Sequence, residues 1–406
     1  MLGALSKWSG ALANTPDASG VVRAALDLAA ARPAGAVHLD YDPPGRGGEV
    51  PVLPDSPPTA DDSQIERAAF MVSNASKPVA IVGLESVAAA SGVMATLERL
   101  GCPILTTYQA LGVVAEGHPQ QAGLFTSGVI ESALIEQCDL VLAVGLDQVE
   151  PMPFRWRYDV PVVSVSERPA CSTLVPITVE VIGPLVAMLD RVVGSSVSAW
   201  PTGSGAAALA AARETLAATS SGTFGPLELA RRVAAKAPAD AIATVDAGAH
   251  FLAIMPFWPA ATPLQLLISN GLATMGFALP AAIGAALARP ARPIVCLVGD
   301  GGLAMTLAEL ETVARLSLPV TVVVFDDAAL SLIEVKQKPG QGGHDAVRFG
   351  PIDYAGVARA MGLDAAVATT GSELSRLLDG GSDRPRLIDA RIDPATYPRL
   401  ITATRG

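Results

Sequence analysis

Several residue classes are scarce in this 406-residue sequence, and each scarcity excludes a class of protein. The four cysteines are scattered, with no CxxC pair and no histidine at ligand spacing, so neither a disulfide framework nor a zinc site is predicted. Aromatic residues make up only 4%, and no cluster of lysine or arginine occurs in a chain of formal net charge -11. Nucleic acid and anionic membrane surfaces are therefore poor partners.

Long apolar runs are missing as well. The first residues, MLGALSKWSGALANT, lack the apolar core and the small-residue cleavage site of a signal peptide. Each longer apolar stretch contains glycine, proline or a charge before it reaches the length of a membrane span. Together with cysteines that read as buried thiols, these absences predict a cytoplasmic protein.

Two linkers divide the chain into three parts. Residues 41–63 are dense in proline, glycine and aspartate, and residues 194–208 are rich in glycine and serine. The predicted parts are a tail at 1–48, a central domain at 64–193 and a C-terminal domain at 209–406. The tail holds one helix, one turn and one strand, which is too little to bury its own apolar faces. We expect it to be the C-terminal remnant of a further domain.

Short apolar runs separated by helical stretches recur in both larger parts. KPVAIVG, CPILTT, CDLVLAVGLD and VPVVSVS occur in the central part, and AIATVDAG, PIVCLVGD, PVTVVVFDD and PRLIDARI occur in the C-terminal part. Such runs are typical of parallel strands that are buried on both faces. The sequence therefore predicts an α/β fold with two doubly wound parallel-sheet domains.

Two carboxylates follow neighbouring strands of the C-terminal part. One predicted strand ends at Asp300 and the next ends at Asp327, with Leu303, Leu307, Leu310 and Ala314 at helical spacing between them. In a right-handed crossover both strands end at the same edge of the sheet, where open α/β sheets bind ligands.

Paired oxygen ligands suit Mg²⁺, and the glycines around Asp300 allow an anion to approach the backbone and the start of the helix. The spacing favours a metal–diphosphate site, although a GDG sequence by itself is more often an ordinary turn.

The surrounding residues carry a resemblance. GDGGLAMTLAELETVARLSLPVTVVVFDDAALSLI (299–333) resembles the signature of thiamine-diphosphate (ThDP) enzymes of the acetolactate synthase-like family, in which an Asn pair follows GDG at this distance. Further segments of that family resemble ISNGLATMGFALPAAIGAAL (268–287), VDAGAHFLAIMPFW (245–258) and LSKWSGAL (5–12).

The resemblance implies a role for each matching residue. Asp300, Asp327 and the backbone carbonyl of Ala329 would bind the metal. Met275 would support the bent cofactor. The remaining residues implied to contact the cofactor are Ala249, His250, Ala273, Gly299, Gly301, Gly302 and Leu330.

Three features depart from the family pattern. The Asn pair is Asp326–Asp327 here, which adds negative charge beside the diphosphate, and Ala273 stands where many relatives have glycine. The central part has VGLDQVEPMPFRW (144–156) in place of the RFDDR-like segment of FAD-carrying relatives, so FAD is not predicted. Of the remaining histidines, His38 and His118 are interpreted as structural, and His344 is open between a structural role and a loop over the substrate.

The resemblance also implies an activity. It indicates a ThDP- and Mg²⁺-dependent carboligase or decarboxylase of 2-oxo acids that works as a homodimer or larger assembly. The activating glutamate belongs to the pyrimidine-binding domain, and no carboxylate of the tail matches it, so we expect a partner or a further part of the chain to supply it. Two alternatives are a non-catalytic ThDP–Mg-binding or scaffold protein and a nucleotide-dependent oxidoreductase. The second is disfavoured because neither VGLES nor VGDGG continues into a full GxGxxG.

Overall fold

The computed structural model describes residues 6–13, 17–31, 34–41, 61–147, 150, 156–169, 175–269, 272–337, 344–381 and 383–406. The chain forms two compact units, residues 1–58 and 59–406. In the first unit, the parallel strands β1 (Trp8–Leu12) and β2 (Val37–Tyr41) flank helix α1 (Ala18–Ala30) in the sequence. The sequence predicts α1 and β2 but not β1.

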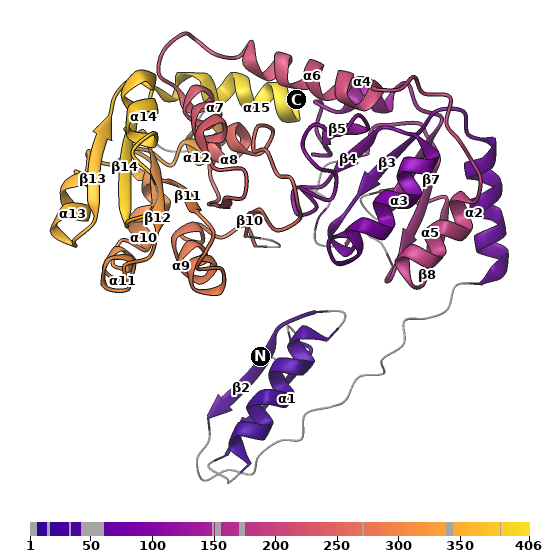
Figure 1. The fold of residues 1–406 in the computed structure, drawn as a ribbon, viewed down its shortest axis with the longest axis horizontal. Coiled ribbons are helices and arrows are strands. Elements are labelled where there is room, and N and C mark those ends of the chain that lie inside the picture. The colour runs from indigo at the N-terminus through magenta and orange to yellow at the C-terminus, as the bar shows by residue number, and fades with distance from the viewer. Residues whose placement is uncertain are drawn as a thin grey trace. The chain divides into compact units, whose positions relative to one another are not determined.

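The second unit contains two parallel sheets of six described strands each (Figure 1). The first sheet has the order β5-β4-β3-β6-β7-β8. Its strands are β3 (Pro78–Val82), β4 (Ile104–Thr106), β5 (Gln121–Leu124), β6 (Leu140–Val144), β7 (Val162–Ser166) and β8 (Val179–Ile182). The accompanying helices are α2 (Asp62–Asn74), η2 (Leu84–Ala89), α3 (Ala90–Leu100), α4 (Ser132–Ile135) and α5 (Leu185–Val193).

The second sheet has the order β10-β9-β11-β12-β14-β13. Its strands are β9 (Ile242–Val245), β10 (Leu266–Ile268), β11 (Ile294–Gly299), β12 (Val320–Asp326), β13 (Asp364–Ala368) and β14 (Arg386–Arg391). The accompanying helices are α6 (Ser204–Ala217), α7 (Pro226–Lys236), α8 (Ala249–Ile254), α9 (Ala278–Ala288), α10 (Asp300–Met305), α11 (Glu309–Arg315), α12 (Ser331–Lys336), η3 (His344–Ala346), α13 (Tyr354–Ala360), α14 (Gly371–Leu378), η4 (Pro394–Thr396) and α15 (Tyr397–Arg405).

Each sheet reverses its strand order beside its first strand, and the second sheet reverses again at its other edge, where β14 lies between β12 and β13. In the first sheet the chain runs outward from β3 to β4 and β5 and then returns to β6 on the other side. In the second sheet it runs from β9 to β10 and returns to β11. These orders confirm the predicted pair of doubly wound sheets. They also place the ligand-binding crevice of each sheet at the carboxyl ends of β3 and β6 and of β9 and β11.

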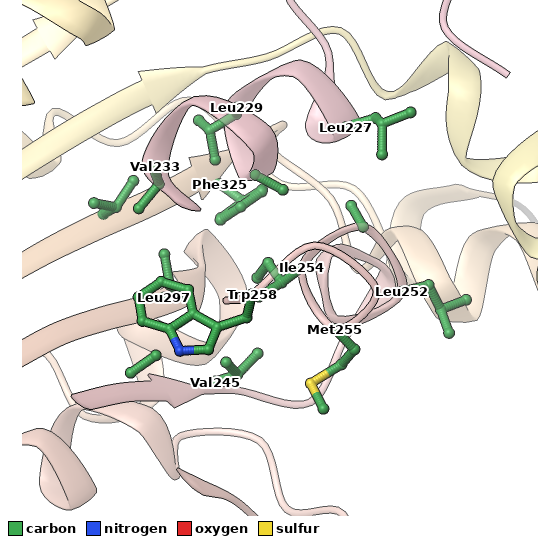
Figure 2. Close-up of a cluster of buried hydrophobic side chains, with 14 of the residues drawn as sticks. Leu227, Leu229, Val233, Val245, Leu252, Ile254, Met255, Trp258, Leu297 and Phe325 are labelled. Carbon is green, nitrogen blue, oxygen red and sulfur yellow. The ribbon is translucent and has the colours of Figure 1, made fainter. Parts of the chain in front are cut away.

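The second sheet is buried on both faces. Figure 2 shows one of these faces, where side chains of α7 and α8 gather with Val245, Leu297 and Phe325 of the three central strands. The next residue of β11, Val298, belongs to a separate buried cluster with α9 and α11. Because alternate residues point to opposite faces, both clusters hold β11 in place, and each fully buried Leu or Val side chain stabilises the fold by roughly 1.5–3 kcal/mol.

One predicted helix is wrong in its length. The helical spacing from Leu303 to Ala314 belongs to two short helices, α10 and α11, because Thr306 leaves the helical conformation at φ -128° and ψ 21°. Leu303 of α10 and Leu310 of α11 are both fully buried. No helix in the described part of the chain has the length and apolar character needed to cross a membrane.

Candidate functional site

Asp300 and Asp327 meet at the carboxyl end of the second sheet, as predicted. Strands β11 and β12 are adjacent and parallel, and Gly299 is opposite Phe325 in the register. The Oδ2 atom of Asp300 accepts hydrogen bonds from the backbone N–H groups of Asp327 at 3.1 Å and Ala328 at 2.6 Å. The carboxylate of Asp300 thus fixes the backbone turn that carries Asp327.

Burial and mutual repulsion make the two carboxyl groups hard to ionise together. Burial, followed by the negative charge of Asp327, raises the pKa of Asp300 to about 8. Burial also raises the pKa of Asp327 to about 6, against the opposing hydrogen bonds from the Ser331 hydroxyl at 2.7 Å and the Ala329 N–H at 3.1 Å. A divalent cation between them would remove this penalty, because its charge favours both ionised forms.

Every residue predicted for the site lines a single cavity of about 210 Å³, here called the acidic cavity. These residues are Ala249, His250, Ala273, Met275, Gly299, Asp300, Gly301, Gly302, Asp327, Ala329 and Leu330. The sequence analysis missed other lining residues, among them Gly248, Phe325, Ser331 and Tyr397. Ser331 could have been found as a hydroxyl four residues after Asp327, whereas Tyr397 carries no local signal.

The glycines after β11 are needed, but for a reason that the sequence does not reveal. A Cβ atom at Gly302 would lie 2.0 Å from the Oδ2 atom of Asp246, and one at Gly301 would lie 2.5 Å from the Cδ2 atom of Leu330. The N–H group of Gly301 is donated at 2.7 Å to the Oδ1 atom of Asp300. Close packing of the chain against itself therefore accounts for Gly301 and Gly302.

His250 is a neutral, buried side chain in the wall of the acidic cavity. Burial lowers its pKa to about 4, and its ring centroid lies 5.3 Å from that of Phe325. Its Nε2 atom has no hydrogen-bond partner among the described residues. An anion at this atom would favour the imidazolium form, in which the Nε2–H group donates a hydrogen bond to the anion.

Asp246 is a further buried carboxylate that the sequence analysis did not select. It follows β9, and its two oxygens accept the N–H groups of Gly276 at 3.0 Å, Phe277 at 2.7 Å and Ala278 at 3.2 Å. These bonds hold the segment that carries Met275 into the acidic cavity. An acid at the end of a buried strand is the signal that identified Asp300, and it would have identified Asp246 too.

Other sequence predictions have separate outcomes. Ala273 adopts φ +47°, a conformation that suits the glycine of relatives. His38 contacts Ser9 and Asp40, and His118 contacts Glu98, so both lie in local polar networks outside the acidic cavity. The side chain of His344 lies outside the described part of the structure.

Among the described residues, no cluster of three or more His, Cys, Asp or Glu side chains forms a metal site. The predicted metal site has only two carboxylates, and its third ligand is a backbone carbonyl. A site of this kind does not need a cluster of three such side chains.

A larger cavity of about 350 Å³ lies near the β5 edge of the first sheet and α6. It contains none of the predicted site residues. Its charged groups are already engaged, since Glu116 pairs with Arg213 at 2.7 Å and Glu131 accepts the hydroxyl of Thr126 at 2.9 Å. The acidic cavity, with its repelling carboxylates, is therefore the candidate site.

Two family models match the two sheets of the second unit. The model described as "Thiamine pyrophosphate enzyme, C-terminal TPP binding domain" matches residues 246–390, and "Thiamine pyrophosphate enzyme, central domain" matches residues 65–192. The first match spans Asp246, His250, Asp300 and Asp327. The chain belongs to the thiamine pyrophosphate enzyme family.

Curated relatives of this family member include acetolactate synthases. "Acetolactate synthase" of Bacillus subtilis is 28% identical over 83% of this chain and 62% of the relative. "Acetolactate synthase isozyme 1 large subunit" of Escherichia coli is 29% identical over 84% of this chain and 64% of the relative. The chain thus spans less than two thirds of the length of these relatives. These matches argue against the alternative of a nucleotide-dependent oxidoreductase.

Proposed function

We propose that the acidic cavity binds the diphosphate of ThDP (thiamine pyrophosphate) through Mg²⁺ and that the protein acts on 2-oxo acids by carboligation or decarboxylation. The metal ligands in this proposal are Asp300, Asp327 and the carbonyl of Ala329. His250 and the backbone at Ala249 and Gly299 face the diphosphate. The observation that carries the proposal is the buried pair of repelling carboxylates, whose ionised forms a divalent cation would stabilise.

The donor set fits a hard divalent cation. Two carboxylate groups and a backbone carbonyl provide oxygen ligands, and Mg²⁺ usually keeps positions for water and phosphate oxygens besides one or two carboxylates. The unpaired Nε2 atom of His250 provides a partner for an anionic oxygen on the same cavity wall. Cation and anion sites therefore lie side by side, as a metal–diphosphate requires.

When bound, ThDP supplies a nucleophilic carbon that adds to the carbonyl of a 2-oxo acid and stabilises the negative charge left by loss of CO₂. The protein's own residues bind and orient. Asp246 holds the segment of Met275, whose apolar side chain supports the cofactor from the cavity wall. Phe325 and Leu330 line the same cavity and keep water from it.

Calorimetry tests the binding proposal. The wild-type chain is titrated with ThDP in the presence of Mg²⁺ and again in EDTA, and we expect heat of binding only with the metal. Asp300→Ala should abolish that heat, because it removes a metal ligand and the acceptor that fixes the Asp327 turn. Asp364→Ala, an exposed aspartate at the amino end of β13, is the matched control and should bind as the wild type does. Unchanged binding by Asp300→Ala would refute the metal assignment.

Turnover is proposed to need a pyrimidine-binding domain, supplied by a partner subunit or by chain beyond these residues, with residues 1–48 as the end of such a domain. An acid placed against the cofactor typically contributes about 10²–10⁴-fold, and positioning adds more. CO₂ release from pyruvate by this chain with ThDP and Mg²⁺ should therefore be slow and should rise by orders of magnitude when that domain is added. A Glu→Gln variant of the added domain should not restore it. Failure of every such domain, with ThDP still bound, would favour the non-catalytic alternative.

Subunit association is part of the proposal. Three large apolar side chains are exposed on segments beside the acidic cavity: Leu272 (90%), Met305 (59%) and Ile333 (48%). Exposed apolar groups gathered around a binding site are typical of protein interfaces. We propose that a second subunit covers them in a homodimer or larger assembly.

A further inference from the structure

A second cavity, about 170 Å³ in volume, adjoins the acidic cavity; we call it the inter-sheet cavity. Ala247, Gly248, Ala273 and Leu332 line both cavities. The first sheet contributes Thr107, Gln109, Phe125 and Glu150 to the inter-sheet cavity, and the end of α15 contributes Arg405. Because a water molecule needs only about 10–15 Å³ of such space, a small organic molecule fits beside the proposed cofactor position.

The wall of the inter-sheet cavity is apolar over much of its extent. Val245 and Ile268 come from β9 and β10, and Phe251 comes from α8. Phe125 adds a second aromatic ring from the first sheet. A short hydrocarbon substituent would lose its contact with water here, which favours binding.

Gln109 gives an independent sign that a ligand belongs in this cavity. Its Nε2 atom is buried and has no hydrogen-bond partner among the described residues. A buried donor without an acceptor is unfavourable, because it has lost its hydrogen bonds to water. An oxygen atom of a bound molecule would remove that cost.

Arg405 gives the cavity a positive charge. Burial raises the pKa of the Tyr108 hydroxyl to about 12, and the charge of nearby Arg405, together with its hydrogen bond to this hydroxyl, opposes this rise. Tyr108, Gln109 and Arg405 all line the inter-sheet cavity. A guanidinium presents its N–H donors in a planar fork that matches a carboxylate.

Among the described residues that line the inter-sheet cavity, Glu150 is the one carboxylate, and it is held by donors of the first sheet. Its Oε2 atom accepts the N–H groups of Leu84 at 2.8 Å and Asp147 at 2.9 Å, and its Oε1 atom accepts the hydroxyl of Thr107. These donors follow β3, β6 and β4, so Glu150 fills the crevice where the first sheet reverses its strand order. The oxygens of Glu150 are therefore already engaged by donors of the first sheet.

We propose that the inter-sheet cavity is the binding site of a short 2-oxo acid, whose carboxylate pairs with Arg405 and whose oxygen accepts the N–H of Gln109. This assignment rests on the proposed function for the class of substrate. Placed here, the acid lies beside the wall shared with the acidic cavity, where the cofactor would meet its carbonyl group. Arg405 and Gln109 then decide that the substrate is an acid, and the aromatic side chains limit the size of its other end.

Ligand-observed NMR tests the proposal with the full chain in the absence of ThDP, so that nothing turns over. The probes are pyruvate and pyruvamide, which have nearly the same shape but differ in charge. We expect pyruvate to bind at least about tenfold more tightly than pyruvamide, since a hydrogen bond to a charged group contributes about 1.5–3 kcal/mol.

Variants of the chain identify the residues responsible. Arg405→Gln should lose about tenfold or more in pyruvate affinity, and Arg405→Lys should keep part of it. Arg399→Gln, which changes an exposed arginine of the same helix, should bind as the wild type does. Gln109→Leu tests the second contact and should also weaken pyruvate binding. Thermal unfolding of each variant shows whether it is folded.

Three results would overturn the assignment. They are no pyruvate binding by the wild-type chain, equal affinity for the two probes, and a loss in Arg405→Gln that is the same for pyruvate and pyruvamide, which would mean a structural role. The outcome is separate from that of the proposed function. Pyruvate binding that depends on Arg405, together with ThDP binding that ignores Asp300, would leave the acid site standing and refute the cofactor site.

Discussion

The carboxyl group of Asp246 lies so close to Gly302 that a Cβ atom at residue 302 would be 2.0 Å from its Oδ2 atom. This contact joins the end of β9 to the start of α10 across the point where the sheet reverses its order. Since Asp246 also binds the segment of Met275, one contact fixes two walls of the acidic cavity.

Gly302→Ala should therefore destabilise the protein and weaken ThDP binding. Overpacking of a buried site costs about 1–3 kcal/mol, and any shift of Asp246 would release the Gly276–Ala278 hydrogen bonds. Chemical denaturation and ThDP calorimetry measure the two effects. Gly284→Ala is the control, since a Cβ atom at this helical glycine meets no atom within 4 Å. It should raise stability by about 0.5–1 kcal/mol. A Gly302→Ala variant as stable as Gly284→Ala would contradict the prediction.

Asp327→Asn should bind ThDP and Mg²⁺ at least as tightly as the wild type. The amide oxygen remains a metal ligand and an acceptor for the Ala329 N–H, while one negative charge beside Asp300 and the diphosphate disappears. Titration calorimetry with the wild type and Asp327→Asn at the same Mg²⁺ concentration gives the comparison. Weaker binding by more than about tenfold would show that the charge of Asp327 is required.

The proposed assembly should depend on the apolar rim of the acidic cavity. Replacing both Leu272 and Met305 with glutamate places two charges in the proposed contact, which should shift the protein toward monomers in sedimentation velocity. Val197→Glu changes a residue that is 73% exposed and lies in the 194–208 segment, so it serves as a control and should leave assembly unchanged. A wild-type chain that is monomeric at micromolar concentration would contradict the proposal directly.

Much of the fold was predictable because buried strands have a local signature. The apolar runs that end before Gly83, Asp147, Asp300 and Asp327 are all strands, each bounded by glycine or an acid. The strands that were missed lack a long continuous apolar run. β1 (WSGAL) and β5 (QAGL) contain a glycine, β8 (VEVI) is interrupted by an acid, β13 (DAAVA) is mostly alanine, and β10 has only three residues. Their pairing with neighbouring strands, rather than their composition, makes them strands.

Some residues of the candidate site were likewise predictable from local sequence, and others were not. Asp300 and Asp327 were predictable because parallel strands end at one edge, and the resemblance supplied the remaining predicted residues. Asp246, Tyr397 and the inter-sheet cavity depend on contacts between segments that are far apart in the sequence. Arg405 reaches its cavity only because α15 ends beside the loop of the first sheet, where Val129 donates its N–H to Thr404 at 3.0 Å.

Glu150 should make stability fall as pH rises through neutrality. Burial raises its pKa to about 7, above the ordinary value of 4.5. In the unfolded chain the group ionises near its ordinary value, whereas in the folded chain it stays protonated until about pH 7. Its contribution is therefore fully present below about pH 4.5 and is lost as pH rises through about 7, on the order of 3 kcal/mol in total.

Urea unfolding of the wild type and of Glu150→Gln at pH 5, 6, 7 and 8 isolates this contribution, because other titrating groups are common to both proteins. The stability of the wild type relative to Glu150→Gln should decrease from pH 5 to about pH 7 and level off toward pH 8. Parallel curves would mean that Glu150 ionises normally and that its hydrogen bonds to Leu84, Asp147 and Thr107 offset its burial.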